Sequence, residues 1–246
     1  VLQRELPVPI WGTADANKVV TIQFAGQTAK TKADREGRWK VWLRPLKANS
    51  TGRELKVISG VDSTLIRDVL VGEVWFSGGQ SNMGYTVGGM ARRLPEGKAL
   101  ADAADFNGIR YRKVNEKNSP TPQTDLTGGD WVVCNLKTVH GISAVGFVYA
   151  RRLHLELKVP IGIIDCAWGG TPIEPYIPIE AFTGHPTLER LAALAKVGDV
   201  EAIKKMRGGT FVRSPAWLAG AIYNGRIAPV APYAIRGAIW YQAESN

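Results

Sequence analysis

The sequence is short of the residues that would tie it to a disulfide framework or to a membrane. It holds only two cysteines, Cys134 and Cys166, and their spacing fits neither a metal-ligand pattern nor a set of disulfides. We expect two buried thiols, with a single disulfide as the alternative. No apolar run reaches the roughly 18 residues that a membrane-spanning helix needs. These shortages exclude disulfide-rich scaffolds and predict that no segment spans a membrane.

Blocks of a single charge are also missing. The net charge is +9, yet the basic residues are scattered as singles and pairs, such as Arg151-Arg152 and Lys204-Lys205. No nucleic-acid-binding motif accompanies them. The scatter therefore predicts a solvated basic surface and no nucleic-acid partner, with weak attraction to acidic glycans or anionic surfaces as the alternative.

The first residues lack the features of a native N-terminus. There is no starting Met, and "VLQRELPVPI" lacks the basic-then-apolar layout of a signal peptide. We expect the natural chain to begin earlier.

Residues 1–69 have the pattern of short β-strands. Apolar and polar residues alternate in "VVTIQF" and again in "RWKVWL", with the turn signal "DREG" between them. The stretches "ELKVIS" and "STLIRDVL" predict two further strands. Strands at this spacing predict a small β-sandwich domain. We expect Trp39 in its core, and a sugar site lined by Trp11, Trp39 and Trp42 is the alternative.

The pattern changes at about residue 70. "VLVGEVWFS" is a nearly continuous apolar strand, as expected of a parallel strand covered on both faces. Residues 142–157 have a helical period, with Ile142, Val145, Val148 or Tyr149, and Leu153 on one side. The strand "VPIGIIDCAW", the helix "AWLAGAIYNGRIAPV" and the strand "IRGAIWYQAESN" follow. This alternation predicts an α/β domain with a parallel sheet over residues 70–246.

A helical excursion interrupts this domain between its second and third strands. Leu188, Leu191, Leu194 and Ala195 form an apolar stripe, and Asp199 is the predicted N-cap of a second short helix. We expect the excursion to pack on the surface, with a lid over the site as the alternative.

Three of the predicted strands end in glycines or polar residues, as "GGQSN", "WGGTPIEP" and "WYQAESN". Ligands bind at the carboxyl ends of the strands in open parallel sheets, so we expect these ends to form one site. Ser81 is either part of a tight turn or a nucleophile that needs a base. Backbone N–H groups of Ser81 and of Gly169 or Gly170 are candidate oxyanion donors, and Gln242 and Asn246 offer side-chain amides. Glu244 is available to accept a hydrogen bond.

The motifs "GGQSNM", "WGGTPIEPY" and "IWYQAESN", in this order, resemble those of the sialate O-acetylesterases. These are SGNH-type serine hydrolases, related to carbohydrate esterases that include acetylxylan esterases. The resemblance covers nearly the whole chain. It implies a small β domain followed by a three-layer α/β/α, flavodoxin-like hydrolase domain. It also implies removal of acetyl groups from sugar hydroxyls, with no metal and no cofactor, and therefore a protein located outside the cytoplasm.

The resemblance also assigns roles. Ser81 is the implied nucleophile, and its N–H and that of Gly170 form the oxyanion hole. Gln242 is favoured over Asn246 as the third donor, and Glu244 is expected to support this block or a catalytic histidine. The neighbours of these residues are expected to bind substrate: Gln80, Asn82, Gly169 and Thr171.

Two features depart from the family pattern. Ala243 stands where the family usually has glycine, and the family's late Asp-x-x-His block is absent. None of His140, His154 and His185 has an aspartate three residues before it. We expect the base to come from a missing C-terminal segment or a second chain, and the 246 residues alone to be inactive.

A carbohydrate-binding protein without activity is the alternative from another class. A protease or lipase is disfavoured, because no Gly-x-Ser-x-Gly elbow surrounds Ser81.

Overall fold

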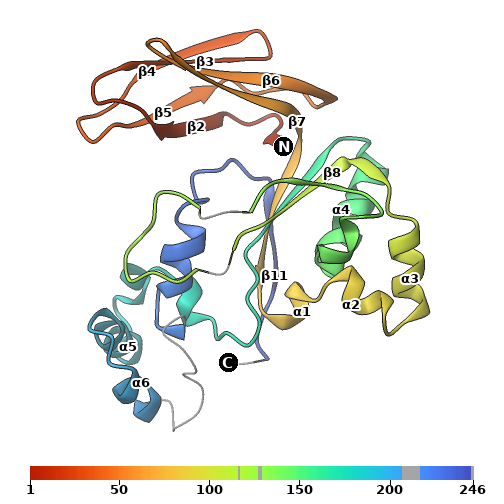
Figure 1. Ribbon diagram of the computed structural model, residues 1–246. Helices are drawn as coiled ribbons and strands as arrows, with labels where there is room; N and C mark the ends of the chain where they lie inside the picture. The colour runs from red at the N-terminus through yellow and green to blue at the C-terminus, as the bar shows by residue number, and fades with distance from the viewer. Residues whose placement is uncertain (116, 127–128, 207–216, 245–246) are drawn as a thin grey trace.

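The computed structural model describes residues 1–246 except 116, 127–128, 207–216 and 245–246. Two β layers occupy one end of the molecule, and a sheet with helices on both sides occupies the other (Figure 1).

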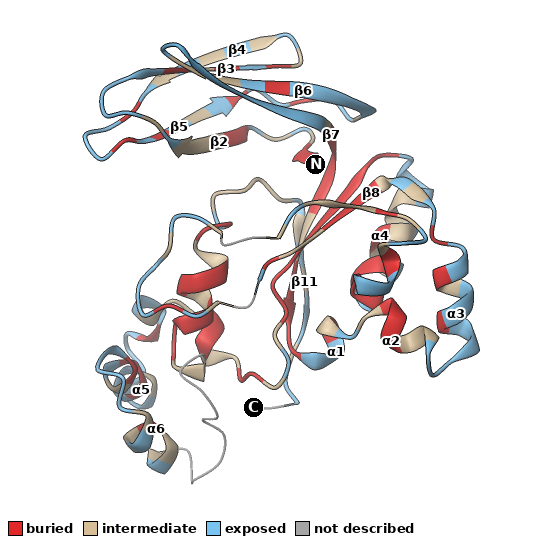
Figure 2. Cartoon of the chain, in the orientation of Figure 1, coloured by how far each residue is buried: buried red, intermediate tan, exposed pale blue. Residues whose placement is uncertain are grey.

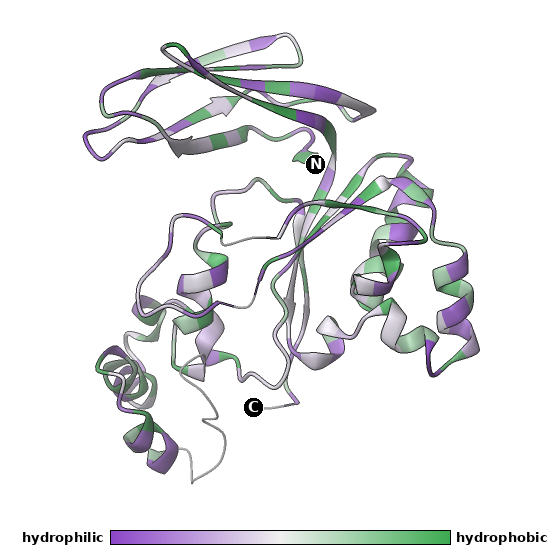
Figure 3. Cartoon of the chain, viewed as in Figure 1, coloured by the Kyte–Doolittle hydropathy of each residue, from purple (hydrophilic) through white to green (hydrophobic). Residues whose placement is uncertain are grey.

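The β layers are built from the N-terminal strands. Strands β3 (Val19–Phe24), β4 (Gln27–Lys32) and β6 (Asn49–Ser59) pair antiparallel, and β2 (Val8–Thr13) pairs with β5 (Arg38–Leu43) in a second small sheet. Apolar and polar residues alternate along β3 and β5 (Figure 3), and the apolar ones meet between the layers. The core there includes Val20, Ile22, Phe24, Trp39 and Leu43, as the alternation predicts.

A single long strand, β7 (Asp62–Gly79), links the two ends of the molecule. Its first part pairs antiparallel with β6, and the short strand β1 (Leu2–Gln3) lies parallel to its middle. Its last part pairs parallel with β10 and β11, and the buried residues of the strand begin near this change of partners (Figure 2). The sequence predicts two strands here. A domain boundary between residues 69 and 70 stays a prediction, and it would fall inside this strand.

Beyond this change of partners, the sheet that contains β3, β4 and β6 continues with the order β11-β7-β10-β8-β9. Strands β8 (Phe106–Lys113), β10 (Ile161–Asp165) and β11 (Gly237–Tyr241) run parallel within it, and β9 (Val132–Cys134) is antiparallel. Helices α2 (Val87–Ala91), α3 (Pro95–Asp102) and α4 (Ala144–Leu157) lie to one side (Figure 1). A helical segment with a π-helical turn at Tyr223–Ile227 lies on the other side. The predicted α/β class is confirmed.

The shorter elements surround the sheet. Helix α1 (Ser81–Gly84) follows β7 directly, and single 3₁₀ turns lie at Val139–Gly141, Glu174–Tyr176 and Ile179–Phe182. The excursion forms α5 (Pro186–Lys196) and α6 (Val200–Met206), whose apolar residues form a small core together with Phe182 and Ala219. Asp199 caps α6 as predicted, with its Oδ1 accepting from Ala202 N at 2.9 Å. Both cysteines are free and buried.

The face predicted for helix α4 is confirmed in part. Ile142 is buried, Leu153 packs against the same core, and the ring of Tyr149 lies 5.1 Å from that of Trp75. The prediction is wrong for Val145 and Val148, which are 37% and 47% exposed, because the helix turns the small Ala144 and Ala150 and the ring of Phe147 toward the sheet instead. The segment around residues 217–231 is also not the regular helix expected, since its long turn is π-helical.

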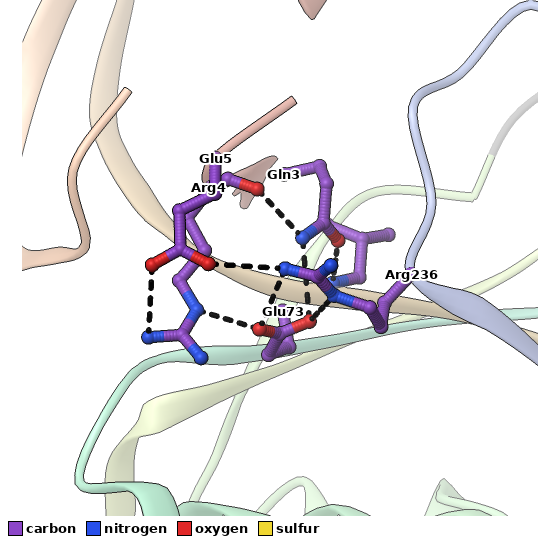
Figure 4. A network of polar contacts seen from close by, with 6 residues as sticks. Gln3, Arg4, Glu5, Glu73 and Arg236 are labelled. Atoms are coloured by element: carbon purple, nitrogen blue, oxygen red, sulfur yellow. Dashed lines mark hydrogen bonds and ion pairs between the residues drawn. The ribbon is translucent and has the colours of Figure 1, made fainter. Parts of the chain in front are cut away.

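The N-terminal segment is fastened to the sheet by a cluster of charges (Figure 4). Glu73 is buried within β7 and accepts hydrogen bonds from Arg4 Nε, Gln3 Nε2 and Arg236 Nε, the last at 2.7 Å. Burial alone would raise the pKa of Glu73, but the bonds from Arg236, Arg4 and Gln3 together hold it below its usual value. Three distant parts of the chain therefore meet at one carboxylate.

Candidate active site

The ends of β7, β10 and β11 lie side by side, because the three strands are parallel neighbours. Backbone hydrogen bonds continue past the strands: Gln80 N donates to Tyr241 O at 3.0 Å, and Trp168 N donates to Gly79 O at 2.9 Å. The three polar turns that follow therefore face one edge of the sheet, where ligands of such sheets bind.

The turn after β7 requires glycine. Gly79 has φ +124°, and a Cβ there would lie 1.9 Å from Tyr241 O. The chain then enters α1, whose first residue, Ser81, is exposed. A side chain at this position is presented to solvent directly above the strand ends.

The second turn lies against the first. A Cβ on Gly169 would be 3.5 Å from Ser81 Cβ, so the two turns are in contact. Gly170 has φ +73°, a left-handed conformation that favours glycine. The backbone of the second turn therefore approaches Ser81 without an intervening side chain.

The third turn is joined to the other two through amide side chains. Glu244 accepts hydrogen bonds from Gln80 Nε2 and Asn82 Nδ2. Gln242 Nε2 donates to Thr171 O at 2.6 Å and to Gln80 Oε1 at 3.3 Å. The amide that the sequence favours as third oxyanion donor is therefore used in internal bonds, and Asn246 lies outside the described residues. Within the described residues, Glu244 bonds to the turn that carries Ser81 and to no histidine.

Two of the residues expected to bind substrate lie behind the surface. Gln80 is 1% exposed and Thr171 is fully buried. Thr171 Oγ1 donates to Trp168 O at 2.6 Å, so its hydroxyl closes the second turn. These side chains are placed to hold the turns, whereas Asn82 and Gly169 are exposed.

Sequence reasoning missed two residues that hold the second turn. Tyr176 OH donates to Gly79 O at 2.7 Å and accepts from Trp168 N at 3.0 Å, and burial raises its pKa to about 12. Arg226 is fully buried, donates to Val114 O and, at 3.4 Å, to Ala167 O, and lies over the Trp168 ring. The only local signal is the aromatic end of "WGGTPIEPY", since Arg226 comes from a distant segment.

The three histidines lie apart from this arrangement. His154 Nδ1 is 2.7 Å from Val159 O at the C-terminal end of α4. His140 is exposed in a 3₁₀ turn, and His185 is exposed at the N-terminal end of α5. Within the described residues, Ser81 Oγ makes no hydrogen bond to any of them. Over the same residues, no three His, Cys, Asp or Glu side chains cluster to hold a metal ion. No helix found there is both long and apolar enough to cross a membrane.

Comparison with known proteins adds independent evidence. No family model matches the sequence. The sialate O-acetylesterase of Rattus norvegicus is 30% identical over 280 residues, covering all of this chain and 50% of the rat protein. The sialate O-acetylesterase of Homo sapiens is 29% identical over 263 residues, covering all of this chain and 47% of the human protein. The crystal structure of a carbohydrate acetylesterase from Xanthomonas citri superposes with a TM-score of 0.82 at 32% identity, covering all of this chain and 49% of that one.

The fold and the proteins it matches define the class as that of the carbohydrate esterases. Within that class, the chain is similar over its whole length to members of the sialate O-acetylesterase family, which confirms the resemblance seen in its motifs. It spans about half the length of the curated relatives that it matches.

Proposed function

We propose that the protein is a carbohydrate O-acetylesterase that uses Ser81 as its nucleophile. The observation that carries the proposal is the contact of the Gly169-Gly170 turn with Ser81, at the carboxyl ends of three parallel strands. An exposed hydroxyl and nearby backbone N–H groups are the parts that acyl transfer requires. The matched relatives carry the names of acetylesterases, in agreement with this chemistry.

The reaction then proceeds in two steps. Ser81 Oγ bonds to the acetyl carbon as a base takes its proton, and the N–H groups of Ser81 and Gly170 stabilise the oxyanion. The sugar oxygen leaves with that proton, and an acetyl-enzyme remains. Water then attacks, and acetate is released with Ser81 restored. We propose that the base is a histidine from outside residues 1–246, in the same polypeptide or in a second chain.

The substrate class follows from the relatives' names. We propose deacetylation of O-acetylated sialic acid, with acetylated xylan as the second substrate to test. Since such glycans lie outside the cytoplasm, we propose the same location for the protein.

The test compares acetate release by the full-length protein and its Ser81→Ala variant on both substrates. We expect the variant to lose at least about 10³-fold in kcat, as removal of a nucleophile does elsewhere. Ser63→Ala is the matched control, because Ser63 is an exposed serine at the opposite end of β7. Unchanged acetate release by Ser81→Ala contradicts the proposal.

A saccharide-binding protein without activity is the second candidate. It is favoured by the missing hydrogen bond between Ser81 and any histidine in the described part of the chain. Saccharide binding by a full-length wild-type protein that releases no acetate supports this candidate.

A further inference from the structure

A buried carboxylate lies directly beneath the two turns that meet at Ser81. Asp165 is the last residue of β10 and is fully buried. Its Oδ1 accepts from Ala167 N at 3.0 Å and from Ser77 Oγ at 3.4 Å, and its Oδ2 accepts from Tyr111 OH. Asp165 thus fastens the beginning of the second turn to β7 and to β8.

The chain of bonds continues from Tyr111 to the nucleophile helix. Ser143 N donates to Tyr111 OH at 3.4 Å, and Ser143 Oγ donates to Met83 O at 2.6 Å. Met83 belongs to α1, two residues after Ser81, and is buried. Ser143 also caps α4, since its Oγ accepts from Gly146 N at 3.0 Å. One end of the network therefore holds the second turn, and the other end holds the helix that carries Ser81.

Stability alone is a weak reason for this arrangement. A buried carboxylate loses its hydration, and apolar replacements of buried charges are often as stable as the original. What an apolar side chain does not provide is direction, because hydrogen bonds fix both the distance and the orientation of the backbone groups they join. Fully bonded buried networks specify one arrangement for that reason.

We propose that Asp165, Tyr111 and Ser143 are positioning residues that set the place of Ser81 relative to the Gly169-Gly170 turn. None of the three belongs to the exposed turns, so they act through the backbone and not on substrate. The proposal rests on the proposed function. It concerns the geometry between the nucleophile and the N–H donors, which oxyanion stabilisation depends on most strongly.

The test uses Tyr111→Phe and Ser143→Ala in the full-length protein, with kcat and KM measured for acetate release. Tyr111→Phe removes one hydroxyl and keeps the ring, and Ser143→Ala removes the bond to Met83. We expect kcat to fall roughly 10- to 100-fold in each, because small misplacements at a reacting centre have effects of this size. KM should change less than about threefold, and the double variant should lose little beyond the larger single loss, as expected within one network.

Tyr233→Phe is the matched control. Tyr233 OH also makes a hydrogen bond, a partly buried one to Val1 O at 2.6 Å, but Tyr233 packs beneath the N-terminal layers, away from the turns. We expect it to lower the unfolding midpoint as Tyr111→Phe does, with kcat unchanged.

The outcomes separate the two proposals. If Ser81→Ala is inactive while both network variants keep the kcat of Tyr233→Phe, the positioning role is wrong and the proposed function stands. If Ser81→Ala is fully active, the proposed function itself is wrong. If Tyr111→Phe does not fold, the kcat of Ser143→Ala alone decides, because that variant loses the bonds of Ser143 Oγ and leaves Tyr111 in place.

Discussion

At the scale of single residues, Ala243 carries the clearest strain in the site. Its φ is +124°, a region that side chains other than hydrogen rarely adopt. The alanine is therefore kept in an unfavourable conformation by the bonds of Gln242 and Glu244 on either side of it.

Replacement by glycine should stabilise the protein. Strain of this kind costs about 1–3 kcal/mol. Glycine removes the strain, but part of this gain in stability is lost because glycine gives the unfolded chain more freedom. We expect Ala243→Gly to raise the free energy of unfolding by about 1 kcal/mol, measured by urea titration. Ala238→Gly, at an exposed position of the preceding strand β11 with ordinary backbone angles, should lower the free energy of unfolding. Equal effects of the two variants would show that Ala243 is not strained.

At the scale of elements, the end of β7 depends on how closely β11 approaches it. Gly79 leaves room for Tyr241 O, and Gly78 leaves room for the ring of Trp240. A side chain at either position would separate the first and third turns.

Gly79→Ala should therefore destabilise the protein strongly. The methyl group would collide with Tyr241 O, and the alanine backbone would have to keep a positive φ. We therefore expect the free energy of unfolding to fall by about 3 kcal/mol or more, together with lost activity. Gly60→Ala is the control, since Gly60 has φ +62° with open space around it. It should cost only about 1–2 kcal/mol. Unfolding by urea compares the two, and similar losses would contradict the close approach.

The elements also show what the sequence can and cannot predict. Strands β7, β10 and β11 are predictable because apolar runs end abruptly in glycine and polar residues. Strand β8 has no such run, because Arg110 and Arg112 interrupt it, and Arg110 is nevertheless buried beside Asp68 at 2.9 Å. The supports of the site are also invisible locally. Arg226 and Val114 are 112 residues apart in sequence, and only the fold makes them neighbours.

At the scale of the whole molecule, Glu73 joins the N-terminal segment, β7 and the segment before β11 (Figure 4). Glu73→Gln keeps the shape but removes the charge that Arg4 and Arg236 face. Both arginines are partly exposed, so we expect the free energy of unfolding to fall by about 2 kcal/mol at neutral pH, less than for a fully buried pair.

The loss should depend on pH in a definite direction. The pKa of Glu73 is below its ordinary value of 4.5 in the folded protein, so its contribution is complete above that value and disappears as the pH falls through the lowered pKa. The difference in unfolding free energy between wild type and Glu73→Gln should shrink on acidification. Glu54→Gln, whose partner Arg67 is also exposed, should show almost no difference at any pH.

The length of β7 has a practical consequence for anyone who wishes to dissect this protein. Its 18 residues pair both with the N-terminal strands and with the parallel strands β10 and β11, with no linker between the two parts. A gene cut anywhere from residue 62 to residue 79 divides a hydrogen-bonded strand, so neither product would keep its sheet complete. Expression of either half should begin or end outside this strand, and the N-terminal layers should be treated as part of the scaffold on which Ser81 is mounted.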